Sequence, residues 1–171
     1  MPTSFVFQPS TTICNILDSN DKFPVRRILC VGANYVAHAI EMGRDPSREP
    51  PFFFAKPSDA IVNADRGLNV QIPYPPQTNN FHYEMEMVVA IGKIASNIEA
   101  DEALSAIWGY GAGIDLTRRD LQKAAKDKGR PWELGKGFDN SAIISSLSPV
   151  SKIGHPDNAR IWLSVNDIIK Q

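Results

Sequence analysis

The sequence predicts an α+β fold that is mainly β. Two long segments, residues 81–92 and 108–116, alternate side-chain character with the two-residue period of a strand. Two shorter apolar segments, residues 27–31 and 52–55, are bounded by turn-forming residues, as strands usually are. Helical patterns are fewer and shorter. A length of 171 residues sets the expectation of one folded domain.

The expected elements can be placed in order along the chain. Strands are predicted over residues 27–31, 52–55, 68–72, 81–92, 108–116 and 160–165. Helices are predicted over residues 35–42, 99–107 and 118–128, with Asn34 and Thr117 as N-caps, Gly43 and Gly129 as terminators, and Leu104 and Ile107 facing the core. Residues 1–24 are interpreted as an N-terminal arm, and residues 25–171 as the folded domain.

The C-terminal residues carry the pattern of an interrupted hairpin. Residues 160–165 alternate like a strand, Asn166-Asp167 has turn chemistry, and residues 168–171 begin a return strand. A hairpin that stops there leaves exposed edge groups, so we expect a chain that is truncated at its C-terminus.

The composition is that of an ordinary soluble protein. The net charge of −1 gives no electrostatic reason to expect nucleic acid or an anionic membrane as a partner. The apolar segments are shorter than a membrane span and the N-terminus has no signal-peptide pattern, so we expect a cytoplasmic protein. Cys14 and Cys30 are expected to be free thiols.

Two glutamates one residue apart stand near the start of the segment 81–92. Glu84 and Glu86 share one face of the predicted strand, while the other face is wholly apolar. Apolar residues on both faces from Met87 onward predict a strand that enters the interior. Like charges that leave water together must protonate or find positive charge, and a hard divalent cation can supply it.

A third acid, Asp115, lies near the end of the segment 108–116. It shares a face with three alternating glycines, and a glycine stripe indicates that another backbone or a ligand passes close by. The oxygen-only set of Glu84, Glu86 and Asp115 suits Mg²⁺ or Mn²⁺, with Ca²⁺ as the alternative. The competing interpretation is a buried ion network in which lysine or arginine pairs with the glutamates. No Cys/His spacing suggests zinc.

His38 and Glu41 lie three residues apart on the first predicted helix and therefore share a face. A histidine held by a carboxylate can activate water, because the carboxylate fixes the tautomer and stabilises the imidazolium. The alternative is a pair of solvated neighbours. His82 adjoins the acids, and both it and His155 are equally compatible with structural roles.

Four basic residues are candidates for contact with a substrate. Lys136 is flanked by glycines that would let a substrate approach, whereas the plainer interpretation is a surface lysine in a loop. Lys56 is expected either to pair with an acid or to contact substrate. Arg118 and Arg119 follow Asp115 and either orient substrate carboxylates or pair with acids of the helix.

Several motifs match, in order and approximate spacing, those of a known family. They are Gly32-Ala-Asn-Tyr35 with His38 and Glu41, Phe54-Ala-Lys-Pro57, His82-Tyr-Glu-Met-Glu86, Gly113-Ile-Asp115 with Thr117, Arg119 and Asp120, and Pro131-Trp-Glu-Leu-Gly-Lys136. On these motifs the chain, from about residue 24 onward, resembles the fumarylacetoacetate hydrolase family. Residues 48–54, 108–111, 116–122 and 126–132 resemble the branch that hydrolyses fumarylpyruvate in gentisate degradation.

The resemblance implies a mixed β-sandwich roll, usually dimeric, that hydrolyses a carbon–carbon bond of an acylpyruvate to give pyruvate and a second acid, here fumarate. It implies metal ligation by Glu84, Glu86 and Asp115, catalysis by His38, Glu41 and Lys136, and substrate contact by Tyr35, Lys56, Arg118 and Arg119. Glu41 would orient His38, which would deprotonate the attacking water. Lys136 and the metal would stabilise the pyruvate enolate.

Two departures from the family pattern leave alternatives open. Many relatives carry arginine where this chain has Ala33, and family members continue through more strands and a Thr-Gly-Thr-Pro-like loop that helps to close the site. The alternatives are an oxaloacetate decarboxylase or a 2-oxo acid hydratase or isomerase of the same family, and an inactive remnant that only binds metal or dimerises.

Overall fold

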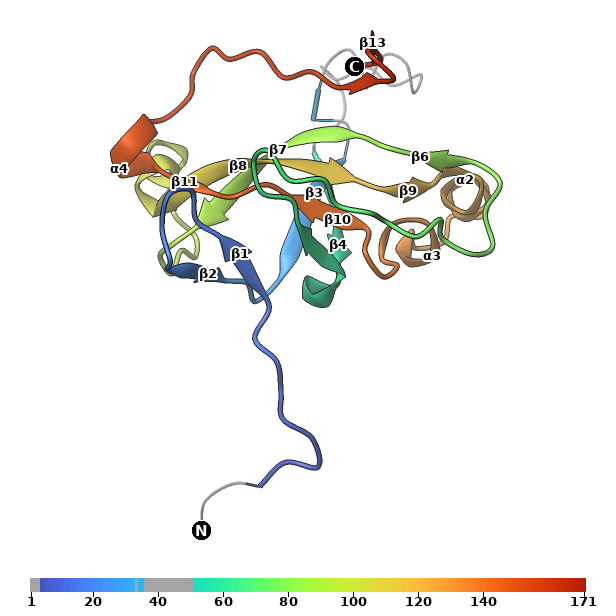
Figure 1. Ribbon diagram of the computed structural model, residues 1–171, viewed down its shortest axis with the longest axis horizontal. Coiled ribbons are helices and arrows are strands. Elements are labelled where there is room, and N and C mark those ends of the chain that lie inside the picture. The colour runs from blue at the N-terminus through green and yellow to red at the C-terminus, as the bar shows by residue number, and fades with distance from the viewer. Residues whose placement is uncertain (1–3, 33, 36–50) are drawn as a thin grey trace.

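The computed structural model describes residues 4–32, 34–35 and 51–171, and its elements are short strands with few helices (Figure 1). In chain order they are β1 (Ile13–Asn15), β2 (Lys22–Pro24), β3 (Ile28–Gly32), β4 (Phe52–Lys56), η1 (Ser58–Ala60), β5 (Ile61–Asn63), β6 (Phe81–His82), β7 (Met85–Ile91), η2 (Ala100–Ala106), β8 (Ile107–Asp115), β9 (Thr117–Arg118), α2 (Arg119–Asp127), α3 (Glu133–Lys136), β10 (Ala142–Ile144), β11 (Ser148–Pro149), α4 (Val150–Ile153), β12 (Ser164–Val165) and β13 (Ile168–Ile169).

The long strand β8 organises the main sheet. Strand β7 runs antiparallel along one edge of β8, and β10 and β11 pair antiparallel with the other edge. Strand β5 then pairs parallel with β10, which makes the sheet mixed. The predicted α+β fold that is mainly β, with a mixed sheet, is therefore confirmed.

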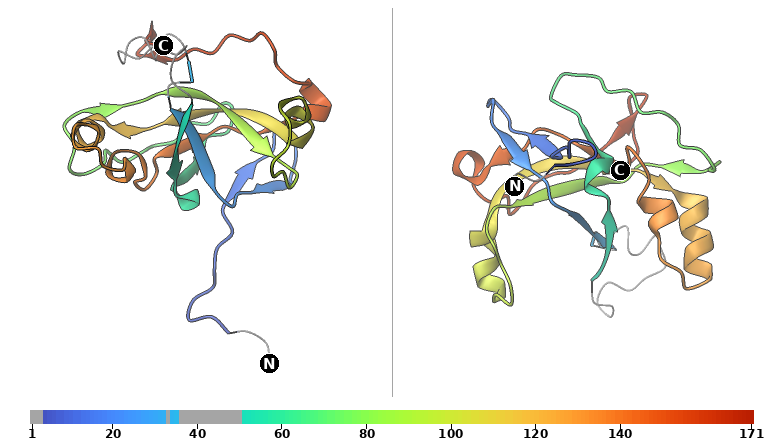
Figure 2. Two further views of the ribbon diagram at one scale, coloured as in Figure 1. Left: turned by 180° about the vertical axis from the view of Figure 1, so that it is seen from behind. Right: turned by 90° about the horizontal axis from the view of Figure 1, so that it is seen from below.

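The α-helices of the described residues lie at the two ends of this sheet (Figure 1). Figure 1 shows α2 and α3 at one end and α4 at the other, with the hairpin of β3 and β4 crossing between them. The views in Figure 2 agree that α2 and α3 lie side by side beyond the end of β7 and β8. Among the described residues, no helix has the length and apolar character needed to cross a membrane.

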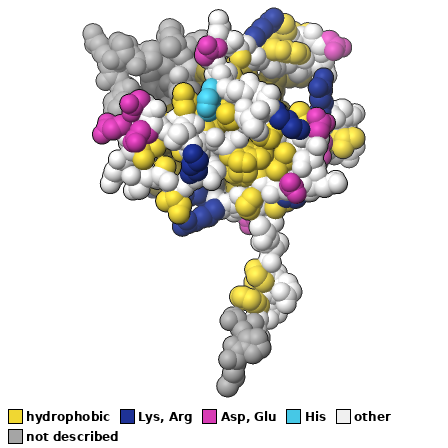
Figure 3. All heavy atoms as spheres, turned by 90° about the vertical axis from the view of Figure 1, so that its left-hand side faces the viewer, with side chains coloured by type: hydrophobic (Ala, Val, Ile, Leu, Met, Phe, Trp, Pro, Cys, Tyr) yellow, Lys and Arg dark blue, Asp and Glu magenta, His cyan; other side chains and the backbone are white. Residues whose placement is uncertain are grey.

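The N-terminal segment divides into two parts. Residues 4–12 extend away from the body, whereas β1 and β2 form an antiparallel hairpin whose Cys14 is buried in the core (Figure 1). Acidic and basic side chains are interspersed on the face that Figure 3 shows, in keeping with the small net charge.

The described residues form two small core clusters on opposite faces of the main sheet. Ile143 and Ile144 follow one another on β10, so their side chains point to opposite faces. Ile144 packs with Leu147 and the β1–β2 hairpin, while Ile143 packs with Leu116 and Phe138.

Most predicted elements are present, two are wrong, and the predicted strand over residues 160–165 is a strand only at Ser164–Val165, as β12. All residues but the first of the predicted helix over residues 35–42 lie outside the described residues. Strands 27–31 and 52–55 appear as β3 and β4, and helix 118–128 as α2. Residues 68–72 form no strand, and the predicted helix over residues 99–107 is a 3₁₀ helix. Glu99 and Glu102 form a capping box there, but Leu104 is exposed rather than in the core.

Strand β7 is covered on one face only, whereas the sequence predicted that it would enter the interior with both faces apolar from Met87 onward. Met87, Val89 and Ile91 are 47%, 39% and 54% exposed, whereas the face that carries Glu84, Glu86 and Val88 packs against the protein. The acids therefore lie on the covered face of the strand, and the methionine and its apolar neighbours lie on the open one.

The glycine stripe of β8 meets another backbone, one of the two predicted possibilities. A Cβ atom on Gly109 would lie 2.5 Å from the carbonyl oxygen of Ser148, and one on Gly111 would lie 2.9 Å from Leu147 Cδ2. Ser148 of β11 and Leu147, the residue before it, therefore lie against Gly109 and Gly111 of β8 at distances that only glycine permits.

Candidate metal and active site

Strand pairing brings the three predicted acids together. In the antiparallel register of β7 and β8, Glu86 lies opposite Gly113. One step further along, the Asp115 N–H donates a hydrogen bond of 2.9 Å to the Glu84 carbonyl oxygen. Residues that face each other in such a register share a face of the sheet, so Glu84, Glu86 and Asp115 all belong to the covered face.

Lys136 links two of these carboxylates. Its Nζ lies 2.7 Å from Glu84 Oε2 and 2.6 Å from Asp115 Oδ2, and the residue is only 1% exposed. Lys136 is the last residue of helix α3, and its side chain extends from that helix to the two carboxylates. The interpretation of Lys136 as a surface lysine is therefore wrong.

The glycine before Lys136 has a packing role. A Cβ atom on Gly135 would lie 2.8 Å from the backbone nitrogen of Gln122, so this glycine lets α3 approach α2 closely. The sequence suggested that Gly135 leaves space for a substrate, but α2 fills that space.

Lys56 forms the second cationic contact of Asp115. Its Nζ lies 2.8 Å from Asp115 Oδ1 and donates hydrogen bonds to the carbonyl oxygens of Leu116 and Lys136. Burial lowers the pKa of Lys56, and the neighbouring Asp115 charge opposes that effect. Of the two roles expected for Lys56, the structure shows the ion pair.

Arg119 completes the ion network at Glu84. Its NH2 group pairs with Glu84 Oε1, and its NH1 group donates a 2.7 Å hydrogen bond to Gln122 Oε1. Gln122 is buried, and the sequence analysis missed it. Its position three residues after Arg119 on α2 was the available signal, because residues three apart share a helix face.

Arg118 lies apart from these acids. Its guanidinium stacks over the ring of Phe138, with 4.4 Å between the guanidinium carbon and the ring centroid. Thr117 is fully buried and does not cap α2, in contrast to the prediction, because its hydroxyl donates to the Asp115 carbonyl oxygen. His155 accepts or donates a 2.7 Å hydrogen bond with the Tyr110 hydroxyl, which gives it a structural role.

Glu86 differs from the other two acids. Among the described residues it forms no ion pair, and its contact is the Tyr35 hydroxyl, which also accepts a 3.1 Å hydrogen bond from the Met87 N–H. Burial, together with the charges of Glu84 and Asp115, raises the pKa of Glu86 to about 7. Burial also raises the pKa of the Tyr35 hydroxyl.

The donor set fits a hard divalent cation, although the side chains do not surround one in this arrangement. Within the described ranges, no three His, Cys, Asp or Glu side chains form a group that could hold a metal ion. Lys136 instead lies between Glu84 and Asp115. One feature nevertheless favours additional positive charge: the pKa of Glu86, which forms no ion pair among the described residues, is raised by burial and by the charges of Glu84 and Asp115.

His38, Glu41 and Ala33 lie outside the described residues. Cys30 of β3 faces the ion network, and burial and the Asp115 charge raise the pKa of its thiol to about 12.

Comparison with known proteins identifies the family. The family model described as "Fumarylacetoacetate (FAA) hydrolase C-terminal" matches residues 27–171. The chain belongs to the fumarylacetoacetate hydrolase family. The resemblance inferred from the motifs is thus confirmed.

Relatives within the family carry more than one activity. The chain is 43% identical over 132 residues to a fumarylpyruvate hydrolase of Ralstonia sp, an alignment that covers 76% of this chain and 66% of the relative. It is 37% identical over 146 residues to a mitochondrial oxaloacetate tautomerase of Oryza sativa subsp. japonica, covering 85% and 63%. The chain spans slightly less than two thirds of the length of these curated relatives.

A solved structure shows the fold and a metal in a relative. The crystal structure of fumarylpyruvate hydrolase from Pseudomonas aeruginosa, in complex with Mn²⁺ and pyruvate, matches with a TM-score of 0.96 and 50% identity. The match covers 98% of this chain and 72% of that one. The Mn²⁺ in that relative agrees with the predicted class of cofactor.

Proposed function

We propose that the chain is a metal-dependent hydrolase that cleaves a carbon–carbon bond of an acylpyruvate, with fumarylpyruvate as substrate and pyruvate and fumarate as products. The observation that carries the proposal is the buried meeting point of Glu84, Glu86 and Asp115 with Lys136. Family membership and the similarity to fumarylpyruvate hydrolases support it. Residues 25–171, together with the β1–β2 hairpin that packs into their core, would form the catalytic domain, and only the residues before Ile13 would be an arm.

Each residue of the site has a proposed role. Glu84, Glu86 and Asp115 would hold Mg²⁺ or Mn²⁺, which when bound supplies Lewis-acid polarisation and binds the 2-oxo acid end of the substrate. Lys136 would stabilise the negative charge that develops on the pyruvate half as the bond breaks, because its ammonium is already fixed within 2.7 Å of both Glu84 and Asp115.

The water-activating pair is proposed from the sequence. His38, oriented by Glu41, would take a proton from the water that attacks the distal ketone. Cleavage would pass the bonding electrons to the pyruvate half, which takes up a proton to become pyruvate. Tyr35, Arg118 and Arg119 are proposed as substrate contacts on the same grounds.

A second candidate activity is the conversion of oxaloacetate, by tautomerisation or decarboxylation. The observation that favours it is the alignment with an oxaloacetate tautomerase over 85% of this chain. Oxaloacetate shares the 2-oxo acid end of an acylpyruvate, so the same acids and Lys136 would hold it. The two substrates differ beyond their shared 2-oxo acid end, where fumarylpyruvate carries a longer group than oxaloacetate.

The setting of the reaction follows from the proposed substrate. We propose a cytoplasmic homodimer that acts in the gentisate branch of aromatic degradation. The exposed apolar residues Leu29, Val31 and Phe53 on the outer face of the β3–β4 hairpin support an association between copies. Light scattering after size exclusion tests this, since a single-chain mass would contradict the dimer.

The proposed function is tested by comparing substrates. The purified chain with Mn²⁺ should release pyruvate from fumarylpyruvate with a higher kcat/KM than it shows for decarboxylation or tautomerisation of oxaloacetate. The reverse order would favour the second activity, and no turnover of either would favour a remnant that only binds metal. His38→Ala should retain Mn²⁺ binding and lose hydrolysis, and unchanged turnover would remove His38 from the reaction.

A further inference from the structure

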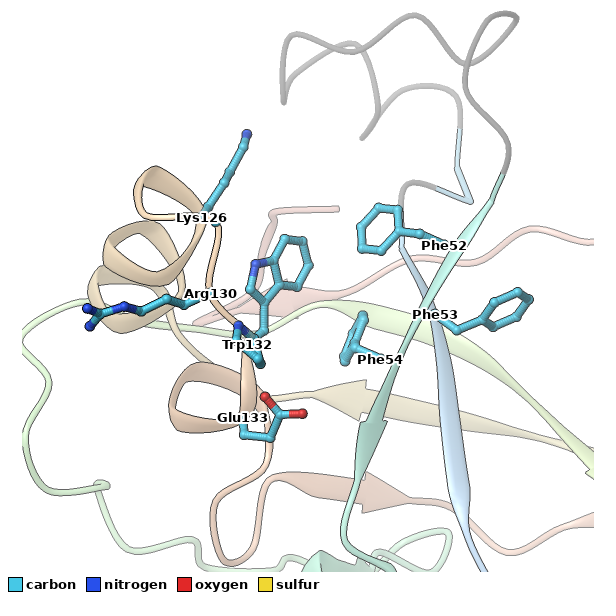
Figure 4. A pocket seen from close by; sticks show the side chains of 9 residues that line it. Phe52, Phe53, Phe54, Lys126, Arg130, Trp132 and Glu133 are labelled. Carbon is cyan, nitrogen blue, oxygen red and sulfur yellow. The ribbon is translucent and has the colours of Figure 1, made fainter.

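An aromatic pocket of about 370 Å³ opens between β4 and the loop that joins α2 to α3 (Figure 4). Phe52 and Phe54 project from β4 toward Trp132, whereas Phe53 points to the other side of the strand. The ring of Trp132 meets Phe52 edge-on, with 5.2 Å between centroids, and lies 5.7 Å from Phe54.

The pocket is joined rigidly to the candidate active site. Trp132 and Lys136 lie four residues apart, and the Lys136 N–H donates a 2.8 Å hydrogen bond to the Trp132 carbonyl oxygen. Residues at this spacing share a helix face and are separated by about 5–6 Å. Phe54 bridges the remaining space, because its ring centroid lies 5.0 Å from Lys136 Nζ.

The aromatic side chains that line the pocket favour flat, conjugated groups of a ligand. The charged ends of Lys126 and Arg130, at the rim, point away from the three rings in Figure 4. The rings of Phe52, Phe54 and Trp132 therefore form most of the walls, and the Glu133 carboxylate lies beside them (Figure 4). Aromatic faces and edges contact flat, conjugated groups better than puckered saturated ones of the same length, since flat groups can lie along the rings.

We propose that this pocket is the subsite for the acyl group of the substrate and that it selects planar, conjugated acyl groups. A substrate whose 2-oxo acid end lies at Lys136 would extend its distal group by about one helical turn, which reaches Trp132. The inference rests on the proposed function and deepens it, because it names the class of acyl group that the site accepts. Trp132 and Phe52 are the specificity-determining residues.

The test compares three acylpyruvates on the full chain with Mn²⁺. Fumarylpyruvate is planar and conjugated, succinylpyruvate has the same charge and length but a saturated chain, and acetylpyruvate lacks the distal group. The kcat/KM for fumarylpyruvate should exceed that for succinylpyruvate by about tenfold. Trp132→Leu and Phe52→Leu should each remove most of this preference and leave acetylpyruvate nearly unchanged, while Trp132→Phe retains it.

Controls separate selectivity from stability. Phe53→Leu changes the same residue type on the same strand but on the opposite side, so it should keep the preference. An equal fall for all three substrates in the Trp132 and Phe52 variants, or a preference that survives both, would overturn the subsite.

A failure of the proposed function has a different signature. If none of the three substrates releases pyruvate, hydrolysis itself is refuted. The affinities of the Mn²⁺-loaded chain for fumarylpyruvate and succinylpyruvate, measured by calorimetric titration, then test the subsite. Tighter binding of fumarylpyruvate, lost in Trp132→Leu, supports it. Equal affinities overturn it.

Discussion

Lys136→Met tests how the buried charges balance one another. The substitution keeps most of the length and volume of the side chain but removes the ammonium shared by Glu84 and Asp115. The described network contains three acids and three bases, so the variant leaves one negative charge uncompensated. Glu84 keeps Arg119 as a partner and Asp115 keeps Lys56.

The expected loss can be worked from burial. The carboxylate side chains are 13% and 7% exposed, and breaking a buried pair usually costs about 3–5 kcal/mol. Because each acid retains a second cation, we expect about 3 kcal/mol. For a chain of this size that corresponds to a fall in Tm of about 10 °C.

The pH dependence has a definite sign. Burial alone would raise the pKa of Glu84, but the charges and hydrogen bonds of Lys136 and Arg119 outweigh burial and lower it. A lowered pKa stabilises the folded state above the unfolded pKa of about 4.3, and this stability is lost as the pH falls through the folded value. The difference between wild type and Lys136→Met should therefore be largest at neutral pH and shrink below about pH 4.

Thermal unfolding in EDTA measures this difference, with Lys123→Met as the matched control. Lys123 pairs with Asp127 at 2.6 Å, but the two side chains are 72% and 55% exposed, so the control should change stability by less than about 0.5 kcal/mol. Equal stabilities of the two variants at pH 7 would refute the account of a tightly balanced buried network.

Four further predictions concern single residues. Glu86→Gln should make the stability in EDTA depend less on pH between about pH 4.5 and 7. The raised pKa of Glu86 destabilises the metal-free wild type progressively as the pH rises through that window. A pH profile of the variant that coincides with that of wild type would contradict this. Glu84→Gln should abolish Mn²⁺ binding measured by the paramagnetic resonance of free Mn²⁺, and tight binding would remove Glu84 from the ligand set. Gly109→Ala should lower the free energy of unfolding in urea by about 1–3 kcal/mol, since its Cβ would meet the Ser148 carbonyl, and an unchanged midpoint would argue against that contact. The thiol of Cys30, with a pKa of about 12, should react only slowly with a thiol reagent at pH 8 in the folded chain, and rapid reaction would contradict the raised pKa.

The acids could be predicted from the sequence because their signal is local. A two-residue period places Glu84 and Glu86 on one face, and a glycine stripe marks Asp115 at the end of a closely packed strand. The register that sets Glu86 opposite Gly113 is a long-range property, and no local pattern contains it.

Other features could not be predicted because they depend on what covers a surface. An alternation of apolar and polar residues identifies two faces of β7, but it does not say which face the rest of the chain packs against. Burial was therefore expected for the whole strand from Met87 onward, whereas only the face that carries the acids is covered, and there the acids pair with Lys56, Lys136 and Arg119. The reach of Lys136 from α3 likewise depends on how α3 packs on α2.

The most direct test of the central claim is the rate of pyruvate release from fumarylpyruvate as Mn²⁺ is added to the EDTA-stripped chain. We expect no release without metal, a saturable rise with Mn²⁺, one fumarate per pyruvate, and no rise in Glu84→Gln. Release that is unchanged by stripping, or absent at every Mn²⁺ concentration, would contradict a metal-dependent hydrolase built on Glu84, Glu86 and Asp115.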